Sequence, residues 1–374
     1  MKIFHTADWH IGKIIFSNYM TDDQEYVIKQ FFDFIHQEKP DLIIISGDLY
    51  DRAVPPSEAV RLVNQTLSEI TLNLKIPLLI IAGNHDSPER LEFLNGILSG
   101  MNLYIEGSLK KEVRKVSFSD MYGNINFYLL PFIETETAKS IYGKDFKDKT
   151  EMMKYIIENI NINTEERNII IAHEYVAGGI ESDSERRLSV GGSEFIDSEV
   201  FRDFDYAALG HLHGRQKIGG KVNYPGSILK YSFSEVSHKK GINCVEFKEK
   251  GNTEIKQLLF KPKKDMKIIE GYFDEIIKNT SEDYLLIRIK DDNHIYDAIN
   301  KLKVRYPNVL SLEFPNIKAS SSLKTYDRDI KKVSPENLFE DFYEEVKGKK
   351  MTLPAKEKVN EIFGEILEYR GDEK

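Results

Sequence analysis

The sequence predicts an α/β protein in which helices flank a core of buried strands, followed by a small α+β module and C-terminal helices. Two patterns support this class. Apolar, strand-like runs recur along residues 1–260, and the ranges 22–38 and 57–72 carry apolar side chains close to the 3.6-residue period of a helix. Length is a third observation, since 374 residues with 41% hydrophobic content exceed what one compact domain usually holds. We therefore expect two or three domains.

In the first part of the chain, apolar runs alternate first with helical patterns and later with short turns. The helical ranges 22–38 and 57–72 follow the first two runs, so both are expected to cover a sheet. Nine runs are expected to form strands, at residues 2–7, 41–47, 77–82, 125–132, 167–172, 205–210, 222–224, 242–247 and 254–260.

The second part of the chain begins after a charged, proline-containing break at residues 261–267, which looks like a linker. A β-α-β-α-β pattern follows and ends near residue 315. In the tail, Ser334 suits an N-cap and Pro335 the first position of a helix, and two short amphipathic helices follow. The predicted domains are a main domain over residues 1–260, a small module over 265–330 and C-terminal helices over 334–374.

Composition excludes several classes of protein. The single cysteine, Cys244, rules out an internal disulfide framework and a cluster of thiolate metal ligands. No apolar run approaches the ~20 residues that span a bilayer, and the sequence reaches Asp8 before a signal-like core could form. We expect a cytoplasmic protein without a membrane partner. The net charge of −9 argues only weakly against a polyanionic partner, because bound divalent cations would reverse the local charge.

Polar side chains of metal-ligand type follow five of the expected strands. Four sets come after the apolar runs KIF, DLIII, PLLIIA and NIII, and the fifth after YAAL. Because ligands bind in the crevice at the carboxyl ends of strands in such sheets, one crevice could collect all five sets. The residues are Asp8 and His10, Asp48, Asn84 and His85, His173, and His211 and His213.

The spacing of these residues suits a two-metal phosphoesterase, which needs two cations about 3.5 to 4 Å apart. Asp48 follows a wholly apolar strand and is the candidate to bridge both cations. Asp8 and His10 are two residues apart, so in an extended segment they point the same way and can hold one cation together. Asn84 supplies a neutral oxygen, whereas His85 points elsewhere and is better placed to act on substrate. Imidazole, carboxylate and amide ligands without sulfur favour Mn²⁺, with Fe²⁺ or Zn²⁺ as alternatives.

The ordered series DxH, GD, GNHD, H and HxH resembles the calcineurin-like metallophosphoesterase superfamily. Within it, the chain is similar to the double-strand-break repair nucleases of the SbcCD type. This closer resemblance covers residues 1 to about 345 and rests on ADWHIG, GDLYDRAVPPSEAV, AGNHDSPERL, ERRLSVGGSEFI, YAALGHLHGRQ, YPGSILKYSFSE and SPENLFEDFY. It implies a metallophosphoesterase β-sandwich flanked by helices, with a capping domain that helps to position DNA.

The resemblance also implies a role for each candidate residue. One metal would be held by Asp8, His10, Asp48 and His213, and the other by Asp48, Asn84, His173 and His211. His85 would assist at the scissile phosphate. The implied activity is Mn²⁺-dependent hydrolysis of DNA, as a 3′ to 5′ exonuclease on duplex ends and an endonuclease on single strands and hairpins, in DNA repair, recombination and replication.

The implied partners are DNA, an SbcC-like coiled-coil ATPase bound by the two tail helices, and a second copy of the chain; the implied location is the nucleoid. The dimer would use apolar stripes after the second and third motifs, although packing onto the chain's own sheet explains these stripes equally well. They comprise Val60, Val63 and Leu67, and Leu91, Leu94 and Leu98.

Two other functions fit parts of the pattern. A free-standing phosphodiesterase or phosphatase for small or protein substrates would share the motifs, and Asp51 and Arg52 complete a GDxxDR pattern also found in protein phosphatases. GNHD and the SVGGSE segment favour the nuclease, and a small-substrate enzyme needs neither the module at 265–330 nor the tail. An inert scaffold would be expected to have lost ligands, and this set is complete.

Overall fold

A computed structural model describes residues 1–93, 95–185, 195–293, 295–316, 335–347 and 349–371. Two compact units are present: Met1–Ile289 with Tyr296–Glu313, and Lys290–Ile295 with Phe314–Lys374. Among the helices in the described ranges, none has the length and apolar character needed to cross a bilayer. The residues SVGGSE and Ser334, singled out in the sequence, lie outside the described ranges.

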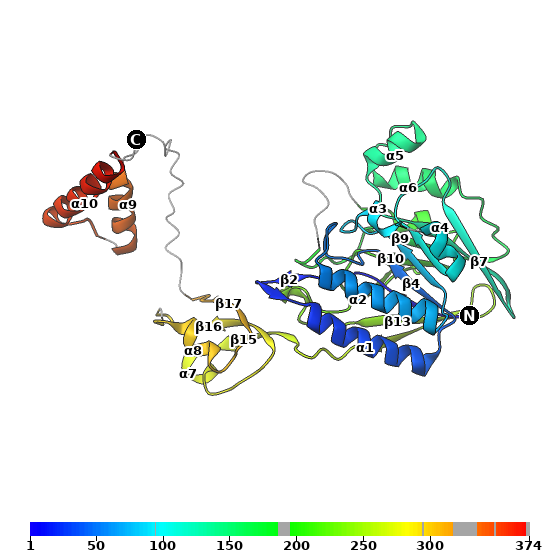
Figure 1. Cartoon of the computed structure of the whole chain (residues 1–374), viewed down its shortest axis with the longest axis horizontal. Helices are drawn as coiled ribbons and strands as arrows, with labels where there is room; N and C mark the ends of the chain where they lie inside the picture. The colour runs from blue at the N-terminus through cyan, green and yellow to red at the C-terminus, as the bar shows by residue number, and fades with distance from the viewer. Residues whose placement is uncertain (94, 186–194, 294, 317–334, 348, 372–374) are drawn as a thin grey trace. The chain divides into compact units, whose positions relative to one another are not determined.

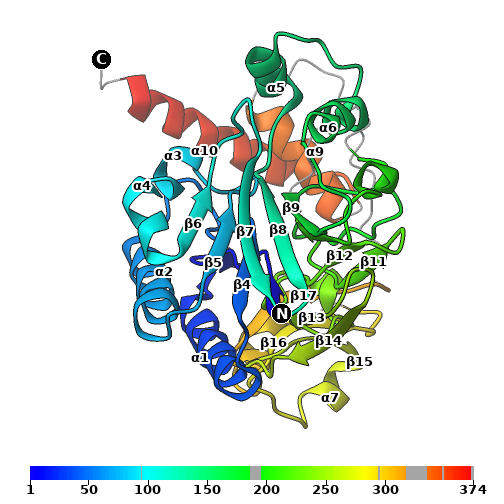
Figure 2. The ribbon, with the colours of Figure 1, turned by 90° about the vertical axis from the view of Figure 1, so that its right-hand side faces the viewer.

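Two six-stranded sheets form the core of the first unit (Figures 1 and 2). In one sheet, the four strands β1, β4, β5 and β6 run parallel and β13 and β14 are added antiparallel. In spatial order this sheet is β14 (Thr253–Leu259), β13 (Gly241–Phe247), β1 (Lys2–Thr6), β4 (Leu42–Ser46), β5 (Leu78–Ile81) and β6 (Leu103–Glu106). The other sheet is β11 (Gln216–Ile218), β12 (Val222–Tyr224), β10 (Tyr206–Gly210), β9 (Arg167–His173), β8 (Gly123–Leu130) and β7 (Arg114–Asp120).

The sheets pack face to face because their central strands are apolar on both sides. Along β4, Ile44 packs between the two sheets, while Ile43 and Ile45 face the helices on the outer side. Along β9, Ile169 and Ile171 join the cluster between the sheets and Ile170 joins the opposite cluster. This alternation follows the two-residue period of a strand. The predicted β-sandwich flanked by helices is confirmed.

Helices cover both outer faces of the sandwich. The helices α1 (Thr21–Glu38) and α2 (Ser57–Ser68) contact each other beside the β1–β4–β5 sheet (Figure 1), and both match their predicted ranges; a π-helical turn, Glu69–Asn73, extends α2. The other helices are α3 (Pro88–Leu91), α4 (Asn95–Leu98), α5 (Thr135–Tyr142) and α6 (Lys149–Glu158), with 3-10 turns at Ser99–Met101, Ser198–Phe201 and Phe233–Glu235. A two-stranded hairpin of β2 (Ile14–Ile15) and β3 (Asn18–Tyr19) precedes α1.

All nine predicted strands are present, whereas β6, β7 and β11 and the hairpin strands β2 and β3 had no counterpart in the sequence prediction. The first three are edge strands of their sheets. Along β7 only Val116 is buried, so the apolar signal that marks a central strand is missing.

The module after residue 261 has the predicted β-α-β-α-β order. It comprises β15 (Met266–Gly271), α7 (Phe273–Ile276), β16 (Tyr284–Ile289), α8 (Ala298–Lys303) and β17 (Val309–Glu313), and its three strands are parallel. Its first two strands pack onto the sandwich domain: Met266 and Tyr284 belong to the hydrophobic cluster around α1, and Tyr284 Oη donates to Asp23 Oδ2 at 2.7 Å. The break at 261–267 therefore connects two parts of one compact unit.

The second unit contains the two tail helices, α9 (Pro335–Lys347) and α10 (Leu353–Gly371). They pack through the rings of Phe339 and Phe363, whose centroids are 6.1 Å apart, and Lys356 pairs with Glu340 at 2.7 Å. Phe342 remains 60% exposed on α9.

The buried His5 on β1 links the two sheets and gives the fold a defined sensitivity to acid. Its Nδ1 lies 2.9 Å from Tyr206 Oη on β10. Burial lowers the pKa of His5 from 6.5 to about 3. The unfolded chain therefore binds one more proton than the folded chain between these pH values, so stability is lost as pH falls through this window.

We predict that His5→Gln flattens this dependence by up to about 1.4 kcal/mol per pH unit, the linkage of one proton. The free energy of unfolding should be measured with urea between pH 6.5 and 4, with EDTA throughout so that metal release does not contribute. The matched control is His36→Gln, an exposed position on α1. Equal slopes for the His5 variant and the parent would refute the assignment.

Candidate metal centre

The five polar motifs meet at one end of the sandwich because each follows the carboxyl end of a strand. Asp8 and His10 follow β1, Asp48 follows β4, and Asn84 and His85 follow β5, which are parallel neighbours in one sheet. His173 ends β9 and His211 and His213 follow β10, parallel neighbours in the other sheet. The structure thus brings together all eight residues that the sequence singled out.

The two sheets approach closely at this end. His173 Nδ1 lies 2.8 Å from the carbonyl oxygen of Ser46, which belongs to the other sheet. A Cβ atom at Gly47 would overlap the His173 ring, and one at Gly83 would overlap the carboxylate of Asp48. The glycines of GD and GNHD are therefore needed for close approach, and Gly47 also has a φ of +87°.

The first group of candidate ligands is Asp8, His10 and His213. Their ligand atoms lie within 4.8 Å of one another, and the Nε2 atoms of His10 and His213 are 3.0 Å apart. All three side chains are buried. Asp8 Oδ1 accepts the backbone N–H of His211 at 2.9 Å, whereas Asp8 Oδ2 has no hydrogen-bond partner among the described residues.

Asp48 lies between this group and the next. Its Oδ2 is 3.6 Å from His10 Nε2 and 3.4 Å from His173 Nε2. Its Oδ1 accepts the backbone N–H of His85 at 2.9 Å. One carboxylate therefore faces imidazoles from both sheets, which is the placement expected of a bridging ligand.

The second group is Asn84, His173 and His211. Asn84 Oδ1 is 3.0 Å from His173 Nε2 and 3.3 Å from His211 Nδ1. The centroids of the two imidazole rings are 5.4 Å apart. Since His173 Nδ1 is engaged by the Ser46 carbonyl, its Nε2 is the nitrogen that faces Asp48 and Asn84.

Backbone strain accompanies four of these ligands. Asp8, His10 and Asp48 have φ values of 52°, 46° and 50°, and His211 has a φ of 103°. Side chains other than glycine rarely adopt this region, at a cost of about 1–3 kcal/mol each. The surrounding fold therefore holds the backbone in the conformation that directs these side chains inward.

The buried environment sets the charge of each group. Burial lowers the pKa values of His10 and His211 well below their usual range. Burial alone would raise the pKa of Asp48, but the neighbouring imidazoles, chiefly His173 with His10 and His85, together hold that pKa well below its usual range. Burial lowers and Asp48 raises the pKa of His173, with a net rise to about 9. Asp8 keeps a raised pKa, chiefly through burial.

The residues fit a pair of divalent cations. Asp8 Oδ2 is buried without a hydrogen-bond partner among the described residues, as is His10 Nδ1, and such orphaned groups are costly unless an ion or water satisfies them. Two imidazole nitrogens 3.0 Å apart also need a shared proton or cation between them. The donor set contains nitrogen and oxygen ligands without sulfur, which suits Mn²⁺, Fe²⁺ or Zn²⁺.

His85 lies beside these groups with a different orientation. Its Nδ1 donates to the carbonyl oxygen of Asp51 at 2.8 Å, and its ring stands edge-on to His10 with centroids 4.7 Å apart. Because Nδ1 is held in this way, Nε2 is the nitrogen that can exchange a proton with a substrate. His85 also forms a third ligand-like group with His10 and Asp51, but Lys13 already binds the Asp51 carboxylate at 2.8 Å.

Sequence reasoning missed Asp86, the last residue of GNHD. Its buried carboxylate accepts the backbone N–H groups of Leu49, Tyr50 and Gly83 at 3.1, 2.9 and 3.0 Å. It therefore fastens the loop that carries Asp48 to the loop that carries Asn84. The sequence did contain a signal for Asp86: it is an acidic residue within the GNHD motif, and the predicted ligand set gives it no role.

A second missed group supports His213. Ser184 Oγ lies 2.6 Å from His213 Nδ1, and Glu235 Oε1 lies 3.6 Å from the same nitrogen. Glu185 accepts the His213 backbone N–H at 2.5 Å, and Lys240 donates to its carbonyl oxygen at 2.7 Å. Buried supports of this kind fix the orientation of a ligand imidazole. They come from segments distant in sequence, so no local pattern indicates them.

A family of known proteins matches the first part of the chain. Residues 1–215 match the calcineurin-like phosphoesterase family, the class that the sandwich and its buried His, Asp and Asn cluster define. Residues 262–347 match a family described as the type 5 capsule protein repressor C-terminal domain. A dimetal phosphatase from Danio rerio with a solved structure is 13% identical, with a TM-score of 0.42, covering 69% of this chain and 95% of that one.

Two curated proteins, each described as the SbcD component of the nuclease SbcCD, match nearly the whole chain. The protein from Staphylococcus saprophyticus subsp. saprophyticus is 34% identical over 98% of this chain and 99% of its own length. The protein from Staphylococcus epidermidis is 34% identical over 99% of this chain and 100% of its own. The chain therefore belongs to the calcineurin-like phosphoesterases and, within them, to the SbcD family of SbcCD nucleases.

We predict that Asp86→Asn weakens metal binding about 10- to 100-fold, as expected when a buried support of a ligand loop is lost. The amide keeps one acceptor oxygen but cannot accept all three backbone N–H groups. Isothermal titration with Mn²⁺ should measure the change, with circular dichroism to verify the fold. The control is Asp33→Asn, an exposed position on α1. Unchanged titrations for both variants would show that Asp86 does not position the site.

Proposed function

We propose that the chain is the nuclease component of an SbcCD-type complex and hydrolyses DNA phosphodiester bonds with two divalent metal ions. The observation that carries this proposal is the placement of Asp48 Oδ2 between His10 Nε2 and His173 Nε2, at 3.6 and 3.4 Å. A single buried carboxylate between two imidazole groups supports a two-metal site, and the names of the relatives support a nuclease.

In this proposal, Asp8, His10, Asp48 and His213 hold one metal, and Asp48, Asn84, His173 and His211 hold the other. When bound, such a pair supplies a nucleophilic water and neutralises charge on the phosphate oxygens. We favour Mn²⁺ from the mixed imidazole, carboxylate and amide donors. The neutral amide of Asn84 limits the negative charge that an approaching phosphate meets.

His85 is proposed to act on the substrate. Its Nδ1–H is fixed by the Asp51 carbonyl, so in the imidazolium form of the ring Nε2 carries the proton that can be donated to the leaving oxygen of the phosphodiester. The preceding residue, Asn84, instead has its Oδ1 beside His173 and His211.

We predict that His85→Ala retains both metals but lowers phosphodiester cleavage about 10²- to 10⁴-fold, the usual contribution of a positioned acid or base. Cleavage of bis(p-nitrophenyl) phosphate and of a labelled oligonucleotide with Mn²⁺ should be measured together with metal content. His36→Ala, an exposed position on α1, serves as the control. Full activity in the His85 variant would contradict its proposed role.

The substrates we propose are duplex ends, for a 3′ to 5′ exonuclease, and single strands and hairpins, for an endonuclease. The competing function, a free-standing phosphodiesterase or phosphatase, is less well supported because the module of β15–β17 packs against the sandwich domain and the helices α9 and α10 follow it. A small substrate needs neither. Incubation with a labelled duplex, a hairpin and a nitrophenyl phosphodiester separates the two.

The tail is proposed to bind the SbcC-like coiled-coil ATPase. On α9, Phe339 contacts Phe363 of α10 but stays partly exposed, and Leu338 and Phe342 are exposed beside it. An apolar face exposed on a helix pair supports a partner that covers it.

We predict that deletion of residues 334–374, or Phe342→Asp, lowers capture of a co-expressed SbcC-like ATPase at least tenfold while Mn²⁺-dependent cleavage of single strands persists. The substitution places a charge on the exposed face, where burial against a partner would be costly. Asn337→Asp adds the same charge elsewhere on α9 and is the control. Normal capture by the truncated chain would show that the tail is not the docking element.

We also propose a homodimer, but the residues proposed to form its interface differ in part from the apolar stripes predicted from the sequence. Val63 and Leu91 are buried in the chain's own core, and Leu94 lies outside the described residues. The exposed apolar side chains in this region are Val54, Val60, Phe93 and Ile97. Packing onto the sheet thus accounts for part of the predicted stripes, and the exposed residues are the better candidates for contact between copies.

A further inference from the structure

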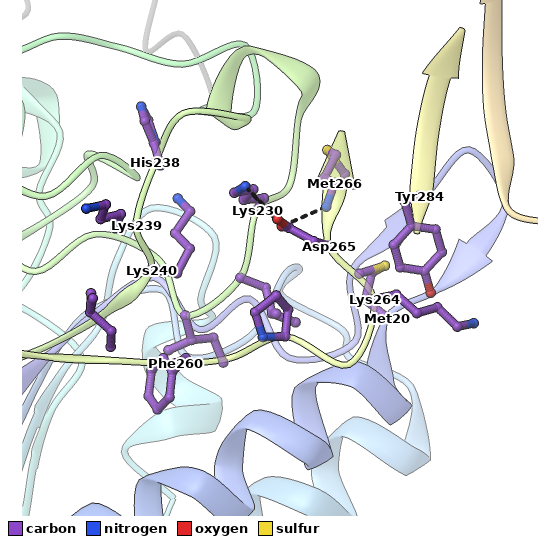
Figure 3. A pocket seen from close by; sticks show the side chains of 14 residues that line it. Met20, Lys230, His238, Lys239, Lys240, Phe260, Lys264, Asp265, Met266 and Tyr284 are labelled. Carbon is purple, nitrogen blue, oxygen red and sulfur yellow. Dashed lines mark hydrogen bonds and ion pairs between the residues drawn. The ribbon is translucent and has the colours of Figure 1, made fainter. Parts of the chain in front are cut away.

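A cavity of about 290 Å³ lies where the module of β15–β17 meets the sandwich domain, and none of the residues assigned to the metals lines it (Figure 3). Its interior is mostly apolar, with Ile228, Leu229 and Phe260 from the sandwich domain and Met266 from β15. A volume near 300 Å³ is at the lower end of sites that enclose a small organic molecule. The interior therefore suits one small, largely apolar group.

The rim of the cavity is cationic. Figure 3 places Lys239 on one side and Lys264 on the opposite side. Neither ammonium group has a carboxylate partner among the described residues, and Lys264 instead lies over the Tyr284 ring at 5.3 Å. By contrast, Lys230 inside the cavity is neutralised by Asp265 at 3.0 Å. Two unneutralised cations in a chain of net charge −9 mark a place where anionic groups would be bound.

The cationic rim continues toward the metal centre. A second groove of about 310 Å³ shares His238 and Lys239 with the cavity and is also lined by Gly214 and Arg215, directly after His213. Arg215 is exposed, and its Nε donates to Asn243 Oδ1 at 2.9 Å. Lys240, in the cavity wall, donates to the carbonyl oxygen of His213. The cavity therefore adjoins a groove whose lining includes the two residues that directly follow His213.

We propose that this cavity binds one unpaired nucleotide of a DNA strand, with its base in the apolar interior and its two flanking phosphates at Lys239 and Lys264. The strand would continue past Arg215 to the metal centre. Cations on opposite sides of the mouth match a nucleotide within a chain, which carries a phosphate on either side, better than a free monophosphate. Every base presents an apolar face, so such a site tolerates any sequence.

This inference rests on the proposed nuclease function and names a structural feature of its substrate, an unpaired nucleotide near the scissile phosphate. The test is photocrosslinking of the full chain in EDTA, which prevents cleavage. The probes are a duplex with a single-stranded overhang carrying 5-iododeoxyuridine, a fully paired duplex carrying the same base, and free 5-iododeoxyuridine monophosphate. Mass spectrometry of the digested protein locates the label.

The overhang is expected to label residues 228–231 or 259–266, and the paired duplex is not. The double variant Lys239→Ala with Lys264→Ala should lower this labelling about tenfold. Lys111→Ala with Lys303→Ala removes the same charge from exposed positions elsewhere and should leave it unchanged. Labelling confined to other segments, equal labelling in the rim variant, or labelling by the free nucleotide but by neither duplex would overturn the inference.

Cleavage by the same preparations in Mn²⁺ distinguishes this inference from the proposed function. If the parent chain cleaves DNA but the overhang never labels the cavity, the inference alone fails. If the parent chain cleaves no DNA, the proposed function fails.

Discussion

Burial of two carboxylates among imidazoles is the constraint on which the rest of this structure depends. Asp8 and Asp48 are almost completely inaccessible to solvent, and bringing unpaired charges into such a site is costly. The fold offsets this cost through His173, backbone N–H donors and a cluster that suits divalent cations. Parallel strands of the two sheets end at the same end of the sandwich, so residues that are distant in sequence meet there. The position of the site therefore follows from the sandwich fold.

The sequence predicted that these side chains converge because their placement follows from the placement of the strands. A buried parallel strand is a continuous apolar run, and its carboxyl end faces the crevice. Asp48 and His173 could therefore be placed from local patterns alone. Asp86 and the group around His213 could not, because their contacts join loops that only the tertiary fold brings together.

The region after residue 261 shows the opposite case. Its charge and proline predict a linker, yet Gln30 accepts the backbone N–H of Lys261 and donates to its carbonyl oxygen. Met266 and Tyr284 then enter the same cluster as α1. The composition of a segment indicates which of its side chains are exposed to solvent. Whether the segment packs on a neighbouring domain depends instead on a few apolar side chains, and here their partners lie more than 200 residues away in the sequence. The β-α-β-α-β order was correct because it needed only local periodicity.

The positive φ values at Asp8, His10, Asp48 and His211 affect how quickly the protein can acquire its ions. Because the fold already holds these backbones in place, the ligands need little rearrangement when a cation enters. Loading would then be limited by the entry of the ion and the loss of its hydration shell, and the assembled protein could exchange one ion for another without unfolding.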